Sequence, residues 1–245
     1  MKKLLPLLLL ILIGCSSLEP EPINIDTMLI ERNDVWYTKD TKQPYSGPVF
    51  SLYPDEEFYL LFEEGTLNNG KLNGPYKSYY ENGQLQTEGT YKDGVREGPF
   101  KVYNEDGQIE EEGTMKSDKI YGYHKIYSYS NGIISDEITY KNGIENGPYK
   151  DYYNGIILEE GTYKNGELDG PCKSYYNGQL IGEITYKNGI EDGPFKFYNE
   201  NGQLELEGTY KDGDYHGPIK KYYDNGQLEF QETYKDGELI ESKEY

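Results

Sequence analysis

Few residues of this chain are suited to nucleophilic or metal chemistry. The sequence contains only two His and two Cys, whereas a structural zinc site usually takes four such ligands. His124 and His216 have no second His or Cys at metal-ligand spacing. His124 and Cys172 occupy one recurrent position that other segments fill with Tyr or Phe, so we interpret both as residues that pack within a sheet. The sequence therefore predicts no metal site and no cofactor.

Carboxylates are abundant, and a pair of them could serve as the acid and base of a hydrolase. The Glu positions recur at regular intervals, however, whereas an active site needs one asymmetric and enclosed place. The Glu110–Glu112 run is typical of a solvated surface. Asp212-Gly213-Asp214 lacks the rest of a calcium-loop pattern, which leaves weak cation binding as an alternative. Without a Walker loop, nucleophile elbow or His-Glu-x-x-His motif, the sequence predicts a protein that is not an enzyme.

The composition limits the class of partner. The chain carries 24 Lys and Arg residues against 44 Asp and Glu residues, a formal net charge of −20. Binding to a phosphate backbone needs an excess of basic residues, so we expect no nucleic-acid partner. A basic protein or peptide would suit the acidic surplus, which we expect near turns and on a charged outer face. Apolar residues make up 35% of the chain, which is little for a thick hydrophobic core.

The N-terminus reads as a targeting segment, residues 1–15. Lys2 and Lys3 precede the apolar stretch 4–13, which as a helix would span roughly 15 Å, about half of a bilayer core. The sequence Leu-Ile-Gly-Cys that ends at Cys15 resembles a bacterial lipobox. This resemblance implies cleavage before Cys15 and lipidation of its thiol, which would hold the mature protein at a membrane. The alternative is an ordinary signal peptide with an incidental Cys15.

The residues after Cys15 bear on localisation. Ser16 and Ser17 follow it without an Asp, which by resemblance to Gram-negative lipoproteins favours the outer membrane over the inner membrane of the cell envelope. We interpret residues 16–33 as a tether and residues 34–46 as a half-hairpin that caps the N-terminal end of a repeat array. No other segment approaches the length of a transmembrane helix.

A repeat of about 24 residues fills 47–245 with about eight units. Each unit opens on Gly-Pro, or on Gly-Tyr in one case, at Gly47, Gly74, Gly98, Gly122, Gly147, Gly170, Gly193 and Gly217. Two turn signals, Asn-Gly or Asp-Gly, separate strand-like segments rich in Tyr, Ile and Thr. The first turn begins at Asn82, Asp106, Asn131, Asn154, Asn177, Asn201 and Asn225, and the second at Asn69, Asp93, Asn142, Asn165, Asn188, Asp212 and Asp236.

These dipeptides favour type I′ turns, the usual two-residue hairpin loops. A two-residue loop at Asn82-Gly83 predicts four cross-strand pairs: Tyr80 with Leu85, Tyr79 with Gln86, Lys77 with Glu88, and Tyr76 with Gly89. The units that open at Gly147 and Gly170 are one residue shorter before their first turn, so they need a bulge or another loop. Ser117-Asp118 lacks the turn Gly, and the first unit is longer, with Pro54-Asp55 at its tip.

Strand alternation then separates a moderately apolar face from a charged face. The charged face carries a Lys in every full unit, at Lys77, Lys101, Lys125, Lys150, Lys173, Lys196 and Lys220. Glu recurs opposite, at Glu88, Glu112, Glu137, Glu160, Glu183 and Glu207. The sequence thus predicts an all-β fold: tandem β-hairpins that form an elongated, twisted, single-layer antiparallel sheet.

One stretch carries a family resemblance. The sequence from Glu88 to Gly94, followed by Gly98-Pro99-Phe100, resembles the MORN repeat in its bacterial variant form, in which chains are often grouped as YwqK-type antitoxins. The resemblance implies a scaffold or interaction module rather than an enzyme, with lipid contact proposed for some members. An immunity-type protein that neutralises a toxin is the alternative function.

One row of tyrosines is the candidate interaction face. Tyr is enriched at protein interfaces, but the same rings could simply fill a sheet that lacks a thick core, and both roles are compatible. The row comprises Tyr79, Tyr103, Tyr127, Tyr152, Tyr175, Tyr198 and Tyr222. We expect a membrane-anchored, non-catalytic interaction or scaffold protein whose partner remains open.

Overall fold

The structure is a computed structural model that describes residues 20–53 and 60–245. The predicted signal peptide, its Cys15 and the Pro54-Asp55 tip of the first unit lie outside the described residues. In the described part of the chain, no helix is both long and apolar enough to span a bilayer.

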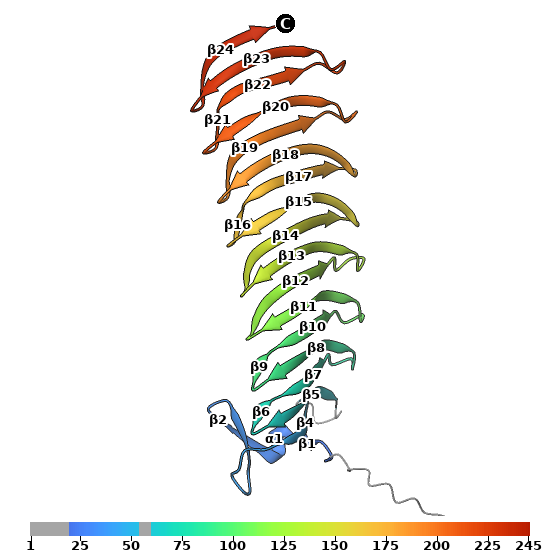
Figure 1. The fold of residues 1–245 in the computed structure, drawn as a ribbon. Coiled ribbons are helices and arrows are strands. Elements are labelled where there is room, and N and C mark those ends of the chain that lie inside the picture. The colour runs from blue at the N-terminus through green and yellow to red at the C-terminus, as the bar shows by residue number, and fades with distance from the viewer. Residues whose placement is uncertain (1–19, 54–59) are drawn as a thin grey trace, which may run out of the picture.

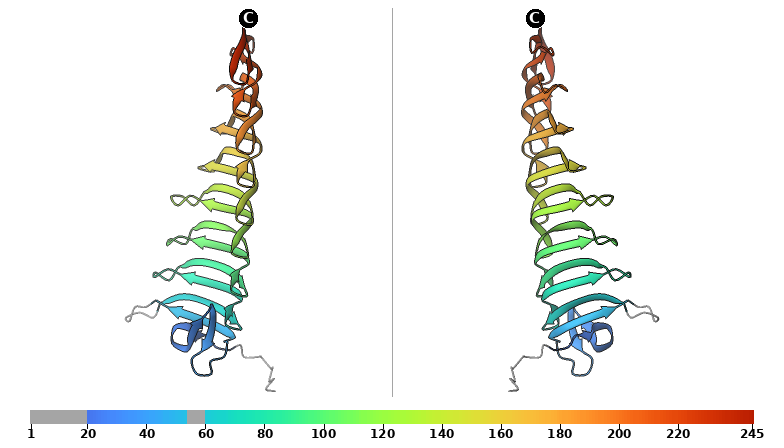
Figure 2. Two further views of the ribbon diagram at one scale, coloured as in Figure 1. Left: turned by 90° about the vertical axis from the view of Figure 1, so that its left-hand side faces the viewer. Right: turned by 90° about the vertical axis from the view of Figure 1, so that its right-hand side faces the viewer.

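The described residues form one long sheet of 22 strands and a separate two-stranded hairpin. Successive hairpins stack from the N-terminal end at the bottom of Figure 1 to the C-terminus at the top, and the stack twists along its length (Figure 2). Neighbouring strands pair antiparallel, except that β1 lies parallel to β4. This arrangement confirms the predicted all-β, elongated antiparallel sheet of tandem hairpins.

The elements before and within the first four hairpins are β1 (Ile23–Asn24), α1 (Ile25–Met28), β2 (Leu29–Arg32), β3 (Val35–Thr38), β4 (Gly47–Leu52), β5 (Leu61–Asn68), β6 (Lys71–Leu72), β7 (Gly74–Tyr79), β8 (Leu85–Lys92), β9 (Val95–Arg96), β10 (Gly98–Tyr103), β11 (Ile109–Lys116), β12 (Lys119–Tyr127) and β13 (Ile134–Lys141). The remaining strands are β14 (Ile144–Tyr153), β15 (Ile156–Lys164), β16 (Glu167–Leu168), β17 (Gly170–Tyr176), β18 (Gln179–Lys187), β19 (Ile190–Tyr198), β20 (Leu204–Lys211), β21 (Asp214–Tyr215), β22 (Gly217–Tyr222), β23 (Leu228–Lys235) and β24 (Glu238–Glu244). The two-residue strands β6, β9, β16 and β21 each lead into the strand that follows.

The N-terminal segment differs from the expected tether and half-hairpin. Residues 23–32 fold into β1, α1 and β2, and β2 pairs with β3 in a complete hairpin. The reason is burial: Ile25 and Leu29 pack against Val49 and Leu67 of the first repeat hairpin, and all four are at most 7% exposed. The Asn24 side chain also accepts hydrogen bonds from the first turn of α1. The ordered cap therefore begins well before residue 34.

The second turn of each unit forms as predicted. Asn69 and Gly70 have φ values of 49° and 76°, as a type I′ turn requires, and Ser117 and Asp118 reach 50° and 62° without a glycine.

The prediction for the first turn of each unit is partly wrong. The pairs of Lys77 with Glu88 and Tyr76 with Gly89 are confirmed, but Tyr79 pairs with Leu85 because Gln86 forms a β-bulge. The bulge lengthens the loop, in which Tyr80 N–H donates to the Gln84 carbonyl oxygen at 2.8 Å. A bulge at this place recurs in all eight hairpins. Among the first turns that lie within the described residues, only those of the two short units, at Asn154-Gly155 and Asn177-Gly178, have positive φ at both residues.

A single row of side chains supplies most of the buried surface along the array. It consists of Val49, Phe100, His124, Tyr149, Cys172, Phe195 and Ile219, each at most 9% exposed. Glycines on the intervening strands make room for the larger rings: a Cβ at Gly161 would lie 2.8 Å from the Tyr149 ring. Beside the smaller Cys172 the intervening residue is Ile184 instead. Ile184 also lies opposite Phe195, and Ile138 lies between His124 and Tyr149, so both glycine and isoleucine occur on the intervening strands.

Candidate functional site

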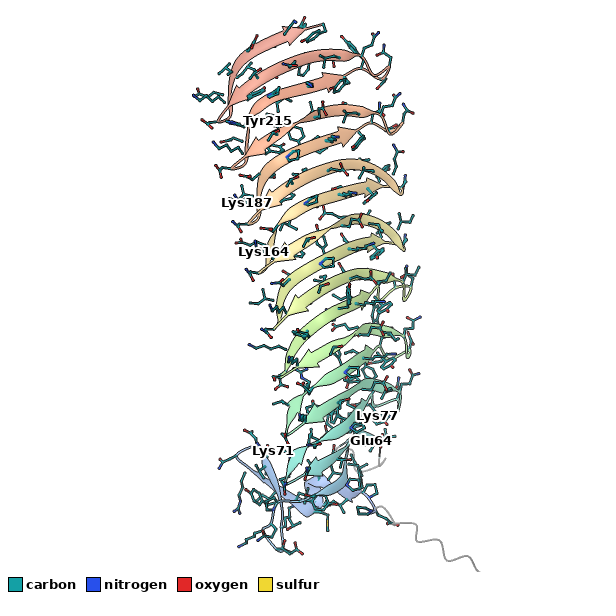
Figure 3. All side chains as sticks on the ribbon, viewed as in Figure 1. Glu64, Lys71, Lys77, Lys164, Lys187 and Tyr215 are labelled. Carbon is teal, nitrogen blue, oxygen red and sulfur yellow. The ribbon has the colours of Figure 1, made fainter. Side chains whose placement is uncertain are left out.

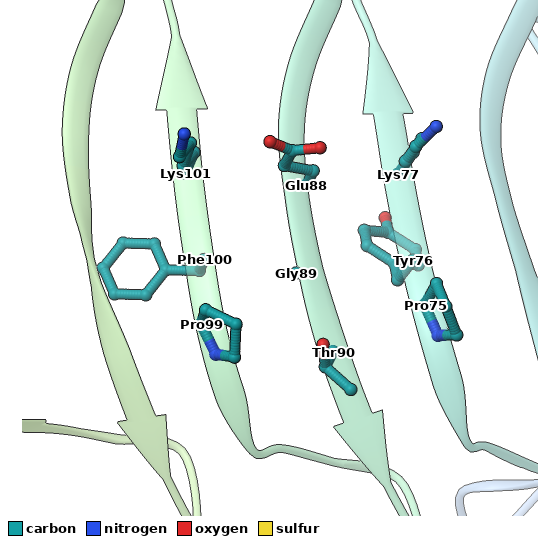
Figure 4. A pocket seen from close by; sticks show the side chains of 9 residues that line it. All are labelled: Pro75, Tyr76, Lys77, Glu88, Gly89, Thr90, Pro99, Phe100 and Lys101. Atoms are coloured by element: carbon teal, nitrogen blue, oxygen red, sulfur yellow. The ribbon is translucent and has the colours of Figure 1, made fainter.

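The sheet presents two chemically different faces. We call the face that carries Lys77 and Glu88 the polar face, and the face that carries Tyr76 and the buried row the apolar face. Figure 4 shows where these residues lie on β7, β8 and β10: Glu88 lies between Lys77 and Lys101, and Tyr76 and Phe100 flank Gly89. A pocket of about 270 Å³ opens there because Gly89 has no side chain. This volume is below the usual range for ligand pockets, about 300–1,000 Å³.

Lys and Glu alternate across the polar face as a continuous ladder. Each Glu in the interior of the array pairs with a Lys on both neighbouring strands, as Glu137 does with Lys125 and Lys150. Five of these contacts fall within ion-pair distance: Lys101–Glu112 at 3.9 Å, Lys125–Glu137 at 3.4 Å, Lys150–Glu160 at 3.4 Å, Lys173–Glu183 at 3.6 Å and Lys220–Glu207 at 3.7 Å. Such partly exposed pairs contribute about 0.2–1 kcal/mol each. In Figure 3, Glu64 and Lys77 lie at the start of this ladder, while Lys71, Lys164 and Lys187 follow the opposite edge of the sheet.

The predicted tyrosine row lies on the same polar face and extends the ladder. Six of its seven hydroxyls donate to a Glu of the preceding hairpin: Tyr79 to Glu64 at 2.6 Å, Tyr103 to Glu88 at 2.7 Å, Tyr127 to Glu112 at 2.8 Å, Tyr152 to Glu137 at 2.9 Å, Tyr175 to Glu160 at 2.8 Å and Tyr222 to Glu207 at 2.8 Å. Within residues 20–53 and 60–245, Tyr198 makes no such bond. The hydroxyls therefore join six of the hairpins to the hairpin before them. A role of the half-buried rings in binding stays a prediction.

These hydrogen bonds change the acidity of the tyrosines. Burial first, and the bond to Glu second, raise the pKa of Tyr79, Tyr103, Tyr127, Tyr152, Tyr175 and Tyr222 to about 12. These six tyrosines are therefore protonated, and able to donate, throughout the physiological pH range.

His124 lies on β12, Cys172 on β17, and His216 between β21 and β22. His124 is 5% exposed, packs against Phe100 and Tyr140, and places Nε2 3.3 Å from a Glu111 oxygen. Burial raises the pKa of the Cys172 thiol, whose sulfur lies 3.3 Å from the Tyr149 hydroxyl. Across the ranges that the structure describes, no three His, Cys, Asp or Glu side chains gather in a group that could hold a metal ion.

Sequence reasoning missed a row of acids on the apolar face. Asp136 pairs with Asp151, and Asp151 pairs with Glu159, so three carboxylates lie side by side on β13, β14 and β15. Burial first, and the charge of Asp136 second, raise the pKa of Asp151. The acidic surplus is therefore not confined to turns and the outer face. The predicted pairing of Lys150 with Glu160 already places Asp151 opposite Glu159. The pairing of Asp151 with Asp136 depends on a register shift after the second turn, which the sequence analysis did not predict.

Comparisons with known proteins bear on the repeat. The family model described as "MORN repeat variant" matches residues 72–93, 96–117, 168–188, 191–212 and 215–236. No curated protein sequence matches the chain. Among solved structures, one titled "Crystal Structure of TarM" aligns over 51% of this chain and 20% of that chain, with 9% identity and a TM-score of 0.25. This chain thus spans about a fifth of that structure, and the two folds are too dissimilar to support an inference.

Each of the five matched segments spans the main part of one repeat unit. MORN repeats suggest a binding or scaffold role for a repeat protein. Five segments of this chain are therefore similar to the MORN repeat variant, and they lie in one continuous sheet.

Proposed function

We propose that this protein is a non-catalytic interaction or scaffold module that is anchored in a bacterial cell envelope through lipid on Cys15, with the outer membrane favoured. The observation that carries the proposal is a single continuous sheet of hairpins whose two faces both reach solvent. Such a sheet offers a long surface of repeated side chains to other proteins. MORN repeats are in keeping with this role.

The anchoring part of the proposal is tested at Cys15. Cys15→Ala should move the protein from the membrane fraction to the soluble fraction of fractionated cells, because the acyl chains would be missing. Cys172→Ala is the matched control, since this thiol is buried in the sheet and should leave the protein in the membrane fraction. Retention of the Cys15→Ala variant in the membrane fraction would contradict lipid anchoring.

The interaction part is tested by cross-linking in intact cells followed by purification. Recovery of several envelope components supports a scaffold. An immunity-type function is the second candidate, because a net charge of −20 suits a basic toxin. One dominant basic partner, encoded next to this protein, would favour that candidate. Purification without any cross-linked protein would contradict both candidates.

A further inference from the structure

The array departs from its own repeat in the middle. The segments that match the repeat model flank residues 118–167, which contain β12 to β15. This stretch contains the unit with an extra residue before its turn, at Asn131, and the first of the two short units, at Asn154. It also contains the three adjacent carboxylates Asp136, Asp151 and Glu159. Chemistry that the other units lack is therefore concentrated in one place.

The three carboxylates lack compensating charge. On the polar face every interior Glu has a Lys on both sides. In the described part of the chain, by contrast, no Lys, Arg or His nitrogen lies within 4 Å of Asp136, Asp151 or Glu159. Like charges directly opposite each other in a sheet are destabilising. The Tyr149 hydroxyl donates to Glu159 and the Tyr152 backbone bonds to Asp151, but neither group carries a positive charge.

Exposed apolar side chains flank the carboxylates on the same face. Tyr153 follows Asp151 by two residues on β14 and pairs with Ile156, which places both on the apolar face next to the turn. Tyr153 is 66% exposed and Ile156 47% exposed. Tyr176 takes the equivalent position on β17 and is 65% exposed. Asn104 and Asn199 occupy this position in two of the longer units. Tyr80 and Tyr223 occupy it in two others but are less exposed, so the two short units present the most exposed rings at this position.

We propose that this patch, made of Asp136, Asp151, Glu159, Tyr153, Ile156 and Tyr176, docks an extended basic segment of a partner protein in which Lys or Arg alternates with apolar residues. The inference rests on the proposed interaction function and names the partner class. The patch and such a segment are complementary in charge, because Lys or Arg side chains of the partner would pair with the three carboxylates, which have no basic partner in the sheet. Tyr153 and Tyr176 would receive the apolar residues and stack on the cations.

The spacing of the patch fits an extended segment. Neighbouring strands lie about 4.8 Å apart, so the three carboxylates span roughly 10 Å across the sheet. Side chains at i and i+2 of an extended chain are about 7 Å apart, so two successive cations lie within reach of three carboxylates. An isolated cation on a helix would reach only part of the row.

The test uses the full mature chain and a defined probe, an eight-residue peptide of alternating Lys and Val. Titration calorimetry at low salt should detect binding, and a peptide of alternating Glu and Val should not bind. Asp136→Asn with Asp151→Asn should weaken binding by about tenfold or more, since two charge pairs are lost. Glu200→Gln with Glu205→Gln is the matched control: these exposed acids lie in a unit that matches the repeat model, and binding should stay within twofold.

The aromatic part of the patch has its own control. Tyr153→Ala with Tyr176→Ala should weaken peptide binding by about tenfold, as expected for anchoring aromatic residues. Tyr223→Ala replaces a tyrosine at the same position in the last unit, 46% exposed, and should leave binding unchanged. Because the Asn variants remove repulsion, their thermal midpoint should equal or exceed that of the natural chain, so lost binding would not reflect unfolding.

Several results would overturn the proposal. Peptide binding that survives the double Asn variant, or that falls equally in the control variant, would show only general attraction to an acidic protein. Calcium chloride alone binding to the natural chain and not to the Asn variant would assign the row to a cation. Sedimentation that shows a dimer of the natural chain but not of the variant would assign it to a second copy. If the Asp136→Asn, Asp151→Asn variant still cross-links to the same envelope partner in cells, the proposed interaction function is supported and this docking site is refuted.

Discussion

Replacing Glu160 by Gln should destabilise the array and weaken the side-chain contacts between two neighbouring hairpins. Glu160 lies on the polar face of β15, where it accepts a hydrogen bond from the Tyr175 hydroxyl at 2.8 Å. Its other oxygen lies 3.4 Å from Lys150 Nζ, and its side chain is 29% exposed. The Tyr175 bond first, and Lys150 and Lys173 after it, hold the pKa of Glu160 below its usual value, although burial opposes them.

The magnitude follows from these contacts. A hydrogen bond to a charged group contributes about 1.5–3 kcal/mol, with the lower end appropriate to a partly exposed site. The ion pair adds about 0.2–1 kcal/mol. Because the Gln amide oxygen can still accept from Tyr175, we expect Glu160→Gln to cost about 1–2 kcal/mol. The coupling energy between Glu160→Gln and Tyr175→Phe should be about 1 kcal/mol.

The effect has a defined pH dependence. A carboxyl group whose pKa is lowered on folding contributes stability above its unfolded pKa, which is 4.5 for Glu. The contribution is lost as the pH falls through the folded value, because the group is then protonated in both states. The difference between the natural chain and Glu160→Gln should therefore be constant from about pH 6 to pH 8 and shrink below about pH 4.5.

The assay is urea unfolding of the two single variants, the double variant and the natural chain, followed by circular dichroism. Repeat arrays can unfold unit by unit, so native-state hydrogen exchange of the β15 and β17 amides should accompany it. Glu200→Gln, an exposed loop carboxylate, serves as the control for charge removal. A coupling energy below about 0.3 kcal/mol, the limit for independent sites, would refute the account of the ladder.

Two further substitutions test the apolar face. Asp151→Asn should raise stability at pH 7 by about 0.5–1.5 kcal/mol because it removes two like-charge pairs. Burial and neighbouring acids raise the pKa of Asp151 on folding, so its penalty is absent below the usual value of 3.8 and grows as the pH rises through the folded value. Thermal midpoints at pH 3.5 and pH 7 check this, and an equal gain at both would contradict it. Gly161→Ala should cost about 1–3 kcal/mol, since its Cβ would meet the Tyr149 ring at 2.8 Å. Gly89→Ala, whose nearest contact is 3.6 Å, is the milder control, and equal losses in denaturation midpoint would count against this packing.

The sequence predicts the repeat, the strands and the Lys–Glu register because each depends on short-range patterns that recur every unit. The register at the first turn was predicted less well, because Gln86 forms a bulge and is left unpaired. The sequence Asn82-Gly83 does not distinguish a two-residue loop from a longer one. The fold of residues 23–32 depends on Ile25 and Leu29 reaching the first hairpin, which is a tertiary contact. Short-range sequence patterns do not predict such contacts.

The acidic row illustrates a different limit. Its three members are visible in the sequence, but only the pairing of Asp151 with Glu159 follows from the predicted Lys150–Glu160 pairing. The pairing of Asp151 with Asp136 follows from a register shift after the second turn, which the structure supplies. A repeat consensus contains only the residues that most units share. Acidic residues that occur together in one unit are therefore not part of it. The candidate docking patch therefore follows from comparing the units with one another after their register is known.

The recurrent bulge has a mechanical consequence. A bulge bends its strand, and here every hairpin is bent at the same place. The bends line up from unit to unit, so the sheet is creased parallel to its long axis, and its strands arch across that axis in Figure 1. A sheet that is bent across its width resists bending along its length more strongly than a flat sheet does. We therefore expect the array to act as a stiff spacer that holds its far end at a set distance from the N-terminal cap.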